Sequence, residues 1–243
     1  MLDDVVANAS VEHYAGIEGR DLVARVVKDH PGRVALLSSF GAESSVMLHM
    51  ISEVAPDLPV IFLDTLKLFP ETLSYRDRLI DELGLTNVRT ATPDADDLKT
   101  RDANDDLSSF DTDQCCHIRK TLPLARIMKD YDVMISGRKR FHGAGRGDLR
   151  FVDIQDGKLK VDPLAAFSPL DLKSYMQKHH LPSHPLRLQG YLSIGCTPCT
   201  SVGGTEDDPR AGRWQGTEKT ECGIHFSANG TIIRTVTRQA ASA

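Results

Sequence analysis

Four short strand-like runs divide the first 140 residues of the chain. Turn-forming residues bound each run, a pattern typical of strands that are buried in a parallel sheet. The four predicted strands cover residues 33–39, 60–64, 87–91 and 132–137.

Segments with apolar residues at helical spacing alternate with these runs. This alternation predicts an α/β fold in which helices cover both faces of a parallel, twisted sheet. The expected helices cover residues 10–29, with Ser10 as the N-cap, and residues 43–54, 70–84, 114–130 and 168–181.

Three other segments do not follow the strand–helix alternation. Residues 92–113 contain eight aspartates, and we predict a solvated loop there rather than a metal site. Residues 151–164 alternate apolar and polar positions around Asp156-Gly157, which indicates a β-hairpin. The chain from residue 195 onward is rich in glycine, threonine and charge and has no clear period.

Composition and charge exclude several classes of protein. The net charge of −5 does not fit a general nucleic-acid binder, so any anion site must be a local basic pocket. No apolar run approaches the ~20 residues of a membrane-spanning helix, and the first ten residues lack the features of a signal peptide. We therefore expect a cytoplasmic protein with reduced thiols that binds neither nucleic acid nor membrane.

Polar and glycine residues follow three of the predicted strands. Residues 38–41 follow the first, Asp64 and Thr65 the second, and residues 137–140 the fourth. In open α/β sheets, ligands bind at the carboxyl ends of the strands. The stretch SSFGAESS (38–45) could cradle an anion at a helix N-terminus, or its serines and glycine could serve helix capping only. It is neither a Walker A loop nor a dinucleotide-binding motif.

Two cysteine pairs stand out in a chain with five cysteines. Cys115 and Cys116 are adjacent, and Cys196 and Cys199 form a CxxC pair. Four thiols can bind zinc or a [4Fe–4S] cluster. The adjacent pair favours the cluster, because a cluster offers separate iron atoms to neighbouring side chains. Four unrelated buried cysteines are the remaining alternative.

The fifth cysteine, Cys222, lies in the sequence ECGIH, three residues before His225. Arg210, Arg213 and Lys219 precede it, and nearby cations lower the pKa of a thiol and make it a better nucleophile. An incidental surface cysteine is the alternative that this short stretch leaves open.

The motifs together carry more information than any one of them. In this order, SSFGAES, LDT-x-x-LFPET, CC-x-x-x-K, GCTPCT, R-x-x-R-W and ECGIH resemble the adenylyl-sulfate reductases of sulfate assimilation, within the wider phosphoadenylyl-sulfate reductase family. The resemblance extends from Ser38 to His225. It implies an adenine-nucleotide α-hydrolase-like sheet of the PP-loop type.

The resemblance also assigns roles to the candidate residues. It implies that Cys222 is the nucleophile and that His225 and Lys120 act with it in catalysis. The implied ligands of a [4Fe–4S] cluster are Cys115, Cys116, Cys196 and Cys199. The implied substrate-binding residues are Ser38, Ser39, Phe40, Gly41, Ala42, Glu43, Leu63, Asp64, Thr65, Lys139, Arg140, Arg210 and Arg213.

The chain departs from the family pattern at two places. The family often has glycine after LDT, where this chain has Leu66. It often has GxRR-[DE]-Q after the fourth strand, where this chain has residues 137–142, GRKRFH. The basic character remains at Lys139 and Arg140, but the acid-and-amide pair is missing.

The resemblance implies a reaction in which adenylyl sulfate and reduced thioredoxin, or glutaredoxin, give sulfite and AMP through a Cys222 S-sulfonate. One cysteine remains outside the two pairs, so an external dithiol must release the sulfite. We expect a nucleotide-binding domain over residues 1–202, which carries the iron–sulfur site, and a flexible catalytic segment over residues 203–243. We also expect a homo-oligomer.

Three alternative functions fit parts of this sequence. A phosphoadenylyl-sulfate reductase performs the same chemistry on a 3′-phosphorylated substrate, but such relatives generally lack the four cluster cysteines. An ATP pyrophosphatase, such as a tRNA-thiolating enzyme, shares the first loop but gives ECGIH no role. A non-catalytic iron–sulfur binding module is the third.

Overall fold

The computed structural model describes residues 11–143, 146–155, 157–206, 208–216, 219 and 221. The predicted cap Ser10, the hairpin residue Asp156, and the candidate catalytic residues Cys222 and His225 lie outside the described residues.

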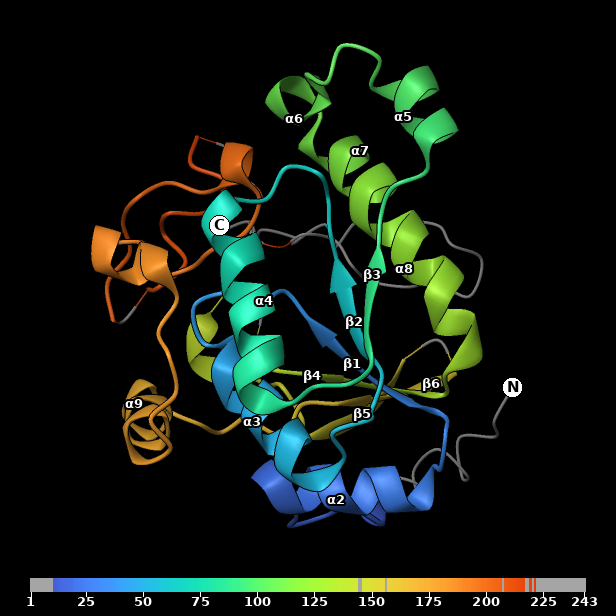
Figure 1. Cartoon of the computed structure of the whole chain (residues 1–243), viewed down its shortest axis with the longest axis vertical. Coiled ribbons are helices and arrows are strands. Elements are labelled where there is room, and N and C mark those ends of the chain that lie inside the picture. Colours follow the sequence, from blue (N-terminus) through green and yellow to red (C-terminus); the bar gives the residue numbers. More distant parts are fainter. Residues whose placement is uncertain are drawn as a thin grey trace, which may run out of the picture.

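A six-stranded sheet forms the centre of the fold, with the strand order β3-β2-β1-β4-β6-β5 (Figure 1). Neighbouring strands are parallel except for β5 and β6, which pair antiparallel as the predicted hairpin. In β1, Leu36 is in register with Val60 of β2 on one side and with Ile135 of β4 on the other. The strands are β1 (Val34–Ser38), β2 (Val60–Leu63), β3 (Val88–Ala91), β4 (Val133–Ser136), β5 (Val152–Gln155) and β6 (Lys158–Val161).

Helices flank this sheet, which confirms the predicted fold class. The first helix is shorter than expected, because Gly16 and Gly19 adopt positive φ angles of 75° and 55° and interrupt it. The helices are α2 (Gly19–Asp29), α3 (Ser44–Val54), α4 (Pro70–Leu83), α5 (Ala95–Arg101), α6 (Leu107–Phe110), α7 (Thr112–Cys116), α8 (Leu122–Ile127) and α9 (Pro169–Lys178). Short 3₁₀ turns cover Met128–Asp130, Arg140–His142, Pro185–Gln189 and Thr197–Cys199.

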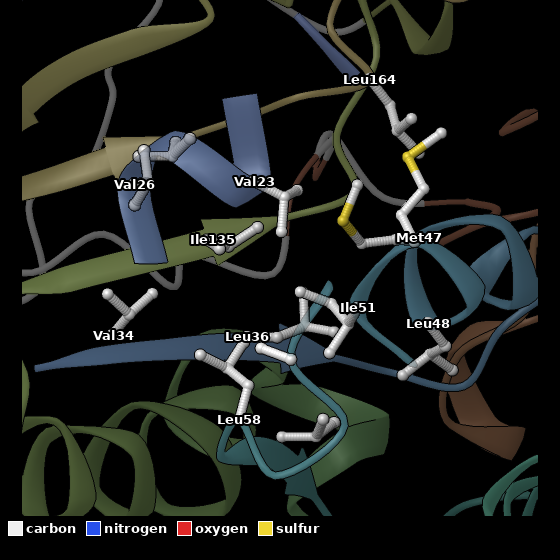
Figure 2. Close-up of a cluster of buried hydrophobic side chains, with 14 of the residues drawn as sticks. Val23, Val26, Val34, Leu36, Met47, Leu48, Ile51, Leu58, Ile135 and Leu164 are labelled. Carbon is white, nitrogen blue, oxygen red and sulfur yellow. The ribbon is translucent and has the colours of Figure 1, made fainter. Parts of the chain in front are cut away.

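One face of the sheet packs against α2, α3, α4 and α9. Leu36 and Ile135 lie on this face, and Figure 2 shows them in one cluster with Val23 of α2 and Ile51 of α3. These four side chains are almost completely buried. Each contributes roughly 1.5–3 kcal/mol through burial of apolar surface.

The opposite face packs against α8. Ala35 and Met134, each one residue before its counterpart on the first face, contact Leu124 and Met128. Successive side chains of a strand point to opposite faces, so both faces of β1 and β4 are apolar. This is why these strands read as continuous apolar runs in the sequence.

Residues 112–130 form a continuous helical segment with a π-helical turn at His117–Thr121 between α7 and α8. Pro123 explains the turn, because it donates no N–H and its ring would clash with the carbonyl four residues earlier in an α-helix. Wider turns of this kind often occur at functional sites. Here four consecutive residues, 118–121, are buried, including Arg119 and Lys120.

The prediction of a solvated loop over residues 92–113 is wrong, since α5 and α6 lie within it. Aspartates begin or brace these elements. The side chain of Asp94 accepts hydrogen bonds from the first turn of α5, and Asp111 caps α7 through Gln114 N. Asp102 accepts a bond from Leu107 N. The short polar side chains that favour loops also favour helix N-termini.

The segment after α9 returns to the carboxyl ends of β1 and β2. In Figure 1 the orange ribbon after α9 runs past α4, consistent with the contacts between α4 and Pro185–Gln189. Leu68 forms an isolated antiparallel bridge with Cys196. Within the residues that the structure describes, no helix combines the length and the apolar character needed to cross a membrane.

Candidate active site

The loop after β1 turns directly into α3. Ser38 Oγ accepts a hydrogen bond from Phe40 N at 3.2 Å, and Phe40 adopts the left-handed region with φ of 48°. The Phe40 ring is fully buried and packs edge-on against Phe62 at 5.4 Å. Gly41 leaves space for Ile194, since a Cβ at this position would lie 3.4 Å from the Ile194 carbonyl oxygen.

No side chain in the described part of the chain caps the N-terminus of α3, which begins after Glu43. Ser38 and Ser39 therefore do not serve as N-caps there. The first-turn N–H groups of a helix attract anions. The geometry thus favours the anion-cradle interpretation of this loop over the capping interpretation.

Glu43, at the end of this loop, lies among cations from the segment after β4. Its Oε2 is 2.7 Å from Lys139 Nζ and 3.0 Å from His142 Nε2. Burial alone would raise the pKa of Glu43, but Lys139 and His142 outweigh it and lower the pKa to about 2. Burial lowers the pKa of both Lys139 and His142, and Glu43 opposes this. The segment after β4 is thus joined electrostatically to the loop after β1.

The loop after β2 holds the CxxC segment in place. Thr65 Oγ1 lies 3.2 Å from Cys196 Sγ, and Thr197 N donates to Lys67 O at 2.8 Å. Asp64 Oδ1 accepts from Leu66 N at 2.9 Å. Leu66 has φ of 60°, so it adopts the left-handed conformation that the family's usual glycine would adopt without strain.

The structure brings the two cysteine pairs together. Cys115 and Cys116 end α7, and Cys196 and Cys199 flank the 3₁₀ turn of the CxxC segment. All four cysteines line one pocket beside α7, and Cys115, Cys116 and Cys196 are buried. The other residues lining this pocket are Thr65, Lys67, Ser108, Arg119, Lys120 and Pro198.

The four thiols share a pocket without converging on one point. No three His, Cys, Asp or Glu side chains in the described ranges are arranged to hold a single metal ion. Burial raises the pKa of the Cys115 thiol, while Arg119 lowers it. The donor set is therefore soft and close to positive charge, and it does not have the form of a preformed tetrahedral zinc site.

Arg119 is a buried residue of the site that the sequence did not single out. One guanidinium nitrogen donates to Thr65 O at 2.9 Å, and the other contacts Asp102 and Asp105, each at 2.6 Å. Asp102 is buried, which raises its pKa, but the bond from Arg119 lowers the pKa overall. Lys67 Nζ contacts the other carboxylate oxygen of Asp105 at 2.8 Å. The aspartate-rich segment thereby supports the thiol pocket.

The two basic residues Arg138 and Arg140 point to different partners. Arg138 forms a salt bridge with the buried Asp162 at 2.6 Å, and Asp162 also bonds Ser136. Arg140 is exposed, donates to Leu149 O at 2.9 Å and stacks on Phe151. Of the predicted substrate-binding residues in this segment, Lys139 thus faces Glu43 and Arg140 faces residues 149–151.

Arg213 lies directly beside the CxxC segment. Its Nε donates to Cys199 O at 3.1 Å, and its guanidinium stacks on Trp214 at 4.4 Å. A Cβ at Gly195 would lie 2.3 Å from this guanidinium, so only glycine permits the approach. Two cations thus lie near the cysteine pairs: Lys120 lines their pocket, and Arg213 contacts the backbone of Cys199.

Arg210 and Arg146 meet at Glu221. Arg210 donates to Glu221 at 3.0 Å, and Arg146 makes two bonds of 2.6 and 2.9 Å to the same carboxylate. Arg146 was not among the predicted site residues, although its place in the basic stretch 138–146 was a signal for it. Cys222 follows Glu221 in the sequence but lies outside the described residues.

A known family model matches most of the chain. Residues 33–202 match the model described as "Phosphoadenosine phosphosulfate reductase domain". The matched stretch covers every strand of the sheet and both cysteine pairs.

Several relatives are similar over most of their length. A protein named adenosine 5′-phosphosulfate reductase from Chelativorans sp. is 44% identical over 195 residues, which cover 80% of each chain. One of the same name from Mesorhizobium japonicum is 42% identical over 215 residues, covering 88% of this chain and 85% of the relative.

A solved structure shares the fold. The phosphoadenylyl-sulfate reductase from Candida auris, in complex with phosphate, aligns with a TM-score of 0.70 at 21% identity, covering 83% of this chain and 98% of that chain. FMN adenylyltransferase from Candida glabrata aligns with a TM-score of 0.53 at 14% identity, covering 71% of this chain and 57% of that chain.

Proposed function

The chain belongs to the phosphoadenosine phosphosulfate reductase domain family, and from this premise we propose that it reduces adenylyl sulfate to sulfite and AMP in sulfate assimilation. The observation that carries the proposal is the gathering of both cysteine pairs around one pocket, with Lys120 in its lining and Arg213 at its edge. The names of the relatives support the unphosphorylated nucleotide as substrate.

We assign substrate binding to the carboxyl ends of β1 and β2. Residues 38–43 and the first turn of α3 offer N–H groups to the phosphosulfate, and residues 63–65 border the same edge of the sheet. Lys120 and Arg213 supply positive charge, which stabilises the negative charge that accumulates on the leaving phosphate. Arg210 supplies further positive charge to the same phosphate.

The four thiols of the pocket fit a [4Fe–4S] cluster better than a single ion. They are soft ligands, they line one space, and no described set of side chains forms a mononuclear site. We propose that Cys115, Cys116, Cys196 and Cys199 hold the cluster. When bound, the cluster supplies a fixed charge next to Lys120, and thiols supply both electrons of the reaction.

In the proposed first step, the Cys222 thiolate attacks the sulfur of adenylyl sulfate. A bond forms between Cys222 Sγ and the sulfuryl sulfur, the bond from that sulfur to the phosphate oxygen breaks, and AMP leaves with the electron pair. His225 contributes a proton or a positive charge near the sulfonate. The product of this step is a Cys222 S-sulfonate.

In the second step, a thiolate of thioredoxin, or glutaredoxin, attacks Cys222 Sγ. Sulfite leaves with the electron pair of the broken S–S bond, and a mixed disulfide forms. The second thiol of the partner resolves this disulfide and restores the Cys222 thiol. The sulfur of the substrate is thereby reduced by two electrons and the dithiol is oxidised by two.

The proposal also covers domain organisation, cellular location and oligomeric state. We propose that residues 203–243 act as a segment that moves between the substrate and the reductant, while residues 1–202 form the nucleotide-binding domain. The demand for reduced thiols fits a cytoplasmic location. We also propose a homo-oligomer, to be checked by light scattering.

The decisive experiment supplies purified protein with adenylyl sulfate and reduced thioredoxin in the absence of ATP. We expect stoichiometric sulfite and AMP and a higher kcat/KM than with the 3′-phosphorylated nucleotide. Preference for the 3′-phosphate would favour a phosphoadenylyl-sulfate reductase. A requirement for ATP with release of pyrophosphate would favour the pyrophosphatase alternative, and iron without turnover would favour a binding module.

A further inference from the structure

Glu221 is held by two arginines from different parts of the chain. Arg146 comes from the segment after β4 and binds both carboxylate oxygens, at 2.6 and 2.9 Å. Arg210 binds one of these oxygens at 3.0 Å. The side chains of Arg146 and Arg210 are only 14% and 12% exposed. A bidentate, partly buried arginine–carboxylate pair defines position more strictly than an exposed ion pair does.

The contacts around Glu221 continue into the loop after β1. Arg146 lies 3.4 Å from His142 Nδ1, and the other ring nitrogen of His142 contacts Glu43. Glu43 is itself bound to the buried Lys139. A connected series of charged and polar groups therefore runs from the loop at the N-terminus of α3 to Glu221. His142 occupies this series at a position where the family's usual acid-and-amide pair is missing.

A second contact holds the same segment from the side of α7. Lys219 Nζ donates to Thr112 O at 3.0 Å and to Asp113 Oδ1 at 2.6 Å. Thr112 and Asp113 form the first turn of the helix that ends in Cys115 and Cys116. Lys219 is thus attached to the first turn of α7, and Glu221 is attached to the segment after β4.

We propose that Arg146 is a positioning residue for the transfer step, because it holds the Glu221 carboxylate and thereby restrains the chain directly before the Cys222 nucleophile. The inference rests on the proposed role of Cys222. Consecutive Cα atoms are ~3.8 Å apart, so an anchor on Glu221 limits the space that the next residue can sample. Attack on sulfur requires such alignment, and loss of alignment by about 1 Å can cost roughly a hundredfold in rate.

This role differs from that of an arginine that binds substrate. A substrate-binding arginine would change nucleotide affinity when removed. A positioning arginine leaves nucleotide affinity unchanged and slows only the transfer step. Its effect must also depend on Glu221, because Arg146 acts through that carboxylate.

The experiment compares Arg146→Gln, Glu221→Gln and the double variant in a single turnover with adenylyl sulfate and without thioredoxin. The rate of S-sulfonate formation is read by mass spectrometry of the peptide that contains ECGIH. Each single variant should lose roughly ten- to a hundredfold in this rate, as expected for a charge-assisted interaction that is lost in the reactive complex. The double variant should lose no more than the worse single variant, since both remove one interaction.

Two matched variants serve as controls. Arg150→Gln removes an exposed arginine from the same segment, and Glu206→Gln removes an exposed carboxylate from the same tail; both should react at the wild-type rate. Arg146→Lys should retain part of the rate, because lysine keeps the charge but not the bidentate geometry. The dissociation constant for AMP should stay within twofold in every variant.

A second readout does not depend on turnover. Without nucleotide, iodoacetamide should alkylate Cys222 several-fold faster in Arg146→Gln and in Glu221→Gln than in the wild type, with unchanged iron content.

Wild-type sulfonation rates in both single variants, multiplicative losses in the double variant, or a weaker Kd for AMP that accounts for the whole loss would overturn the inference. Absence of a Cys222 sulfonate in the wild type would instead contradict the proposed function. The alkylation rates would still test whether the pair of Arg146 and Glu221 restrains Cys222.

Discussion

Thr65 and Cys196 are 131 residues apart in the sequence, yet Thr65 Oγ1 lies 3.2 Å from Cys196 Sγ. The contact joins the carboxyl end of β2 to the CxxC segment, and the bridge between Leu68 and Cys196 reinforces it. One cysteine pair is thereby fixed to the sheet. The other pair ends α7, directly before the π-helical turn, and lines the same pocket.

Thr65→Val keeps the shape of this side chain and removes its hydroxyl. We expect the variant to lose roughly 1–3 kcal/mol of stability, because the hydroxyl loses its contact with Cys196 Sγ and the hydrogen bond that it accepts from Lys67 N. We also expect it to lose bound iron faster in the presence of a chelator. Thr86→Val, which affects an exposed hydroxyl remote from the pocket, should lose iron at the wild-type rate. Equal rates in the two variants would show that the Thr65 contact does not support the cysteines.

Cys196→Ser should lower the iron content of anaerobically purified protein and abolish sulfite production, because one of four proposed ligands is lost. Cys222→Ser should abolish sulfite production and retain full iron content. The measurements are iron and acid-labile sulfide per chain and the absorbance of the visible charge-transfer band. Full iron content in serine variants of all four paired cysteines would refute the ligand assignment.

Arg119→Gln should destabilise the protein by roughly 3–5 kcal/mol, because it leaves the buried carboxylate of Asp102 without its cation. Arg126→Gln is the matched control, since Arg126 is half-exposed and pairs with Asp94 and Asp97. Exposed ion pairs of this kind contribute about 0–1 kcal/mol to stability. Urea unfolding at neutral pH measures both. Similar losses in the two variants would mean that Arg119 does not carry the aspartate-rich segment.

Glu43→Gln should reduce stability by an amount that depends on pH. The folded-state pKa of Glu43 is about 2, below its ordinary value of 4.5. The carboxylate therefore stabilises the fold fully above about pH 5.5, and this contribution decreases as the pH falls towards 2. From the two pKa values, the difference between wild type and variant should shrink by roughly 2 kcal/mol between pH 7 and pH 3. A constant difference over that range would contradict the pairing with Lys139.

Leu66→Asn should raise the stability by about 0.5–1 kcal/mol, because asparagine tolerates the left-handed φ of 60° better than leucine does. The Leu66 side chain is exposed, so little apolar burial is lost. Leu188→Asn, at another exposed leucine with negative φ, should give no such gain in thermal unfolding. A loss in Leu66→Asn would indicate that the leucine side chain itself has a role on the surface.

The sequence by itself determined the four strands along residues 33–137 and the helices between them, apart from α5 and α6. The runs of β1 and β4 are apolar on both faces, so neither needs a distant partner to be recognised as a buried strand. The family resemblance rests on the paired cysteines, the glycine-bearing loop after β1 and the sequence ECGIH. Such short motifs can be recognised from the identity and spacing of their residues alone. The predicted hairpin was confirmed for the same reason, since its period and its turn are both local.

Only the tertiary structure decided what the charged residues do. The aspartates of residues 92–113 read as solvent-exposed loop residues, because side-chain charge predicts exposure unless a cation is known to lie nearby. Arg119 supplies that cation to Asp102 and Asp105 through the fold. In the same way, the sequence predicted Lys139 and Arg140 as equivalent, yet Lys139 faces Glu43 and Arg140 faces Leu149. Ion pairs between distant segments leave no periodic signal, so the basic stretch 138–146 could be located from the sequence but its partners could not.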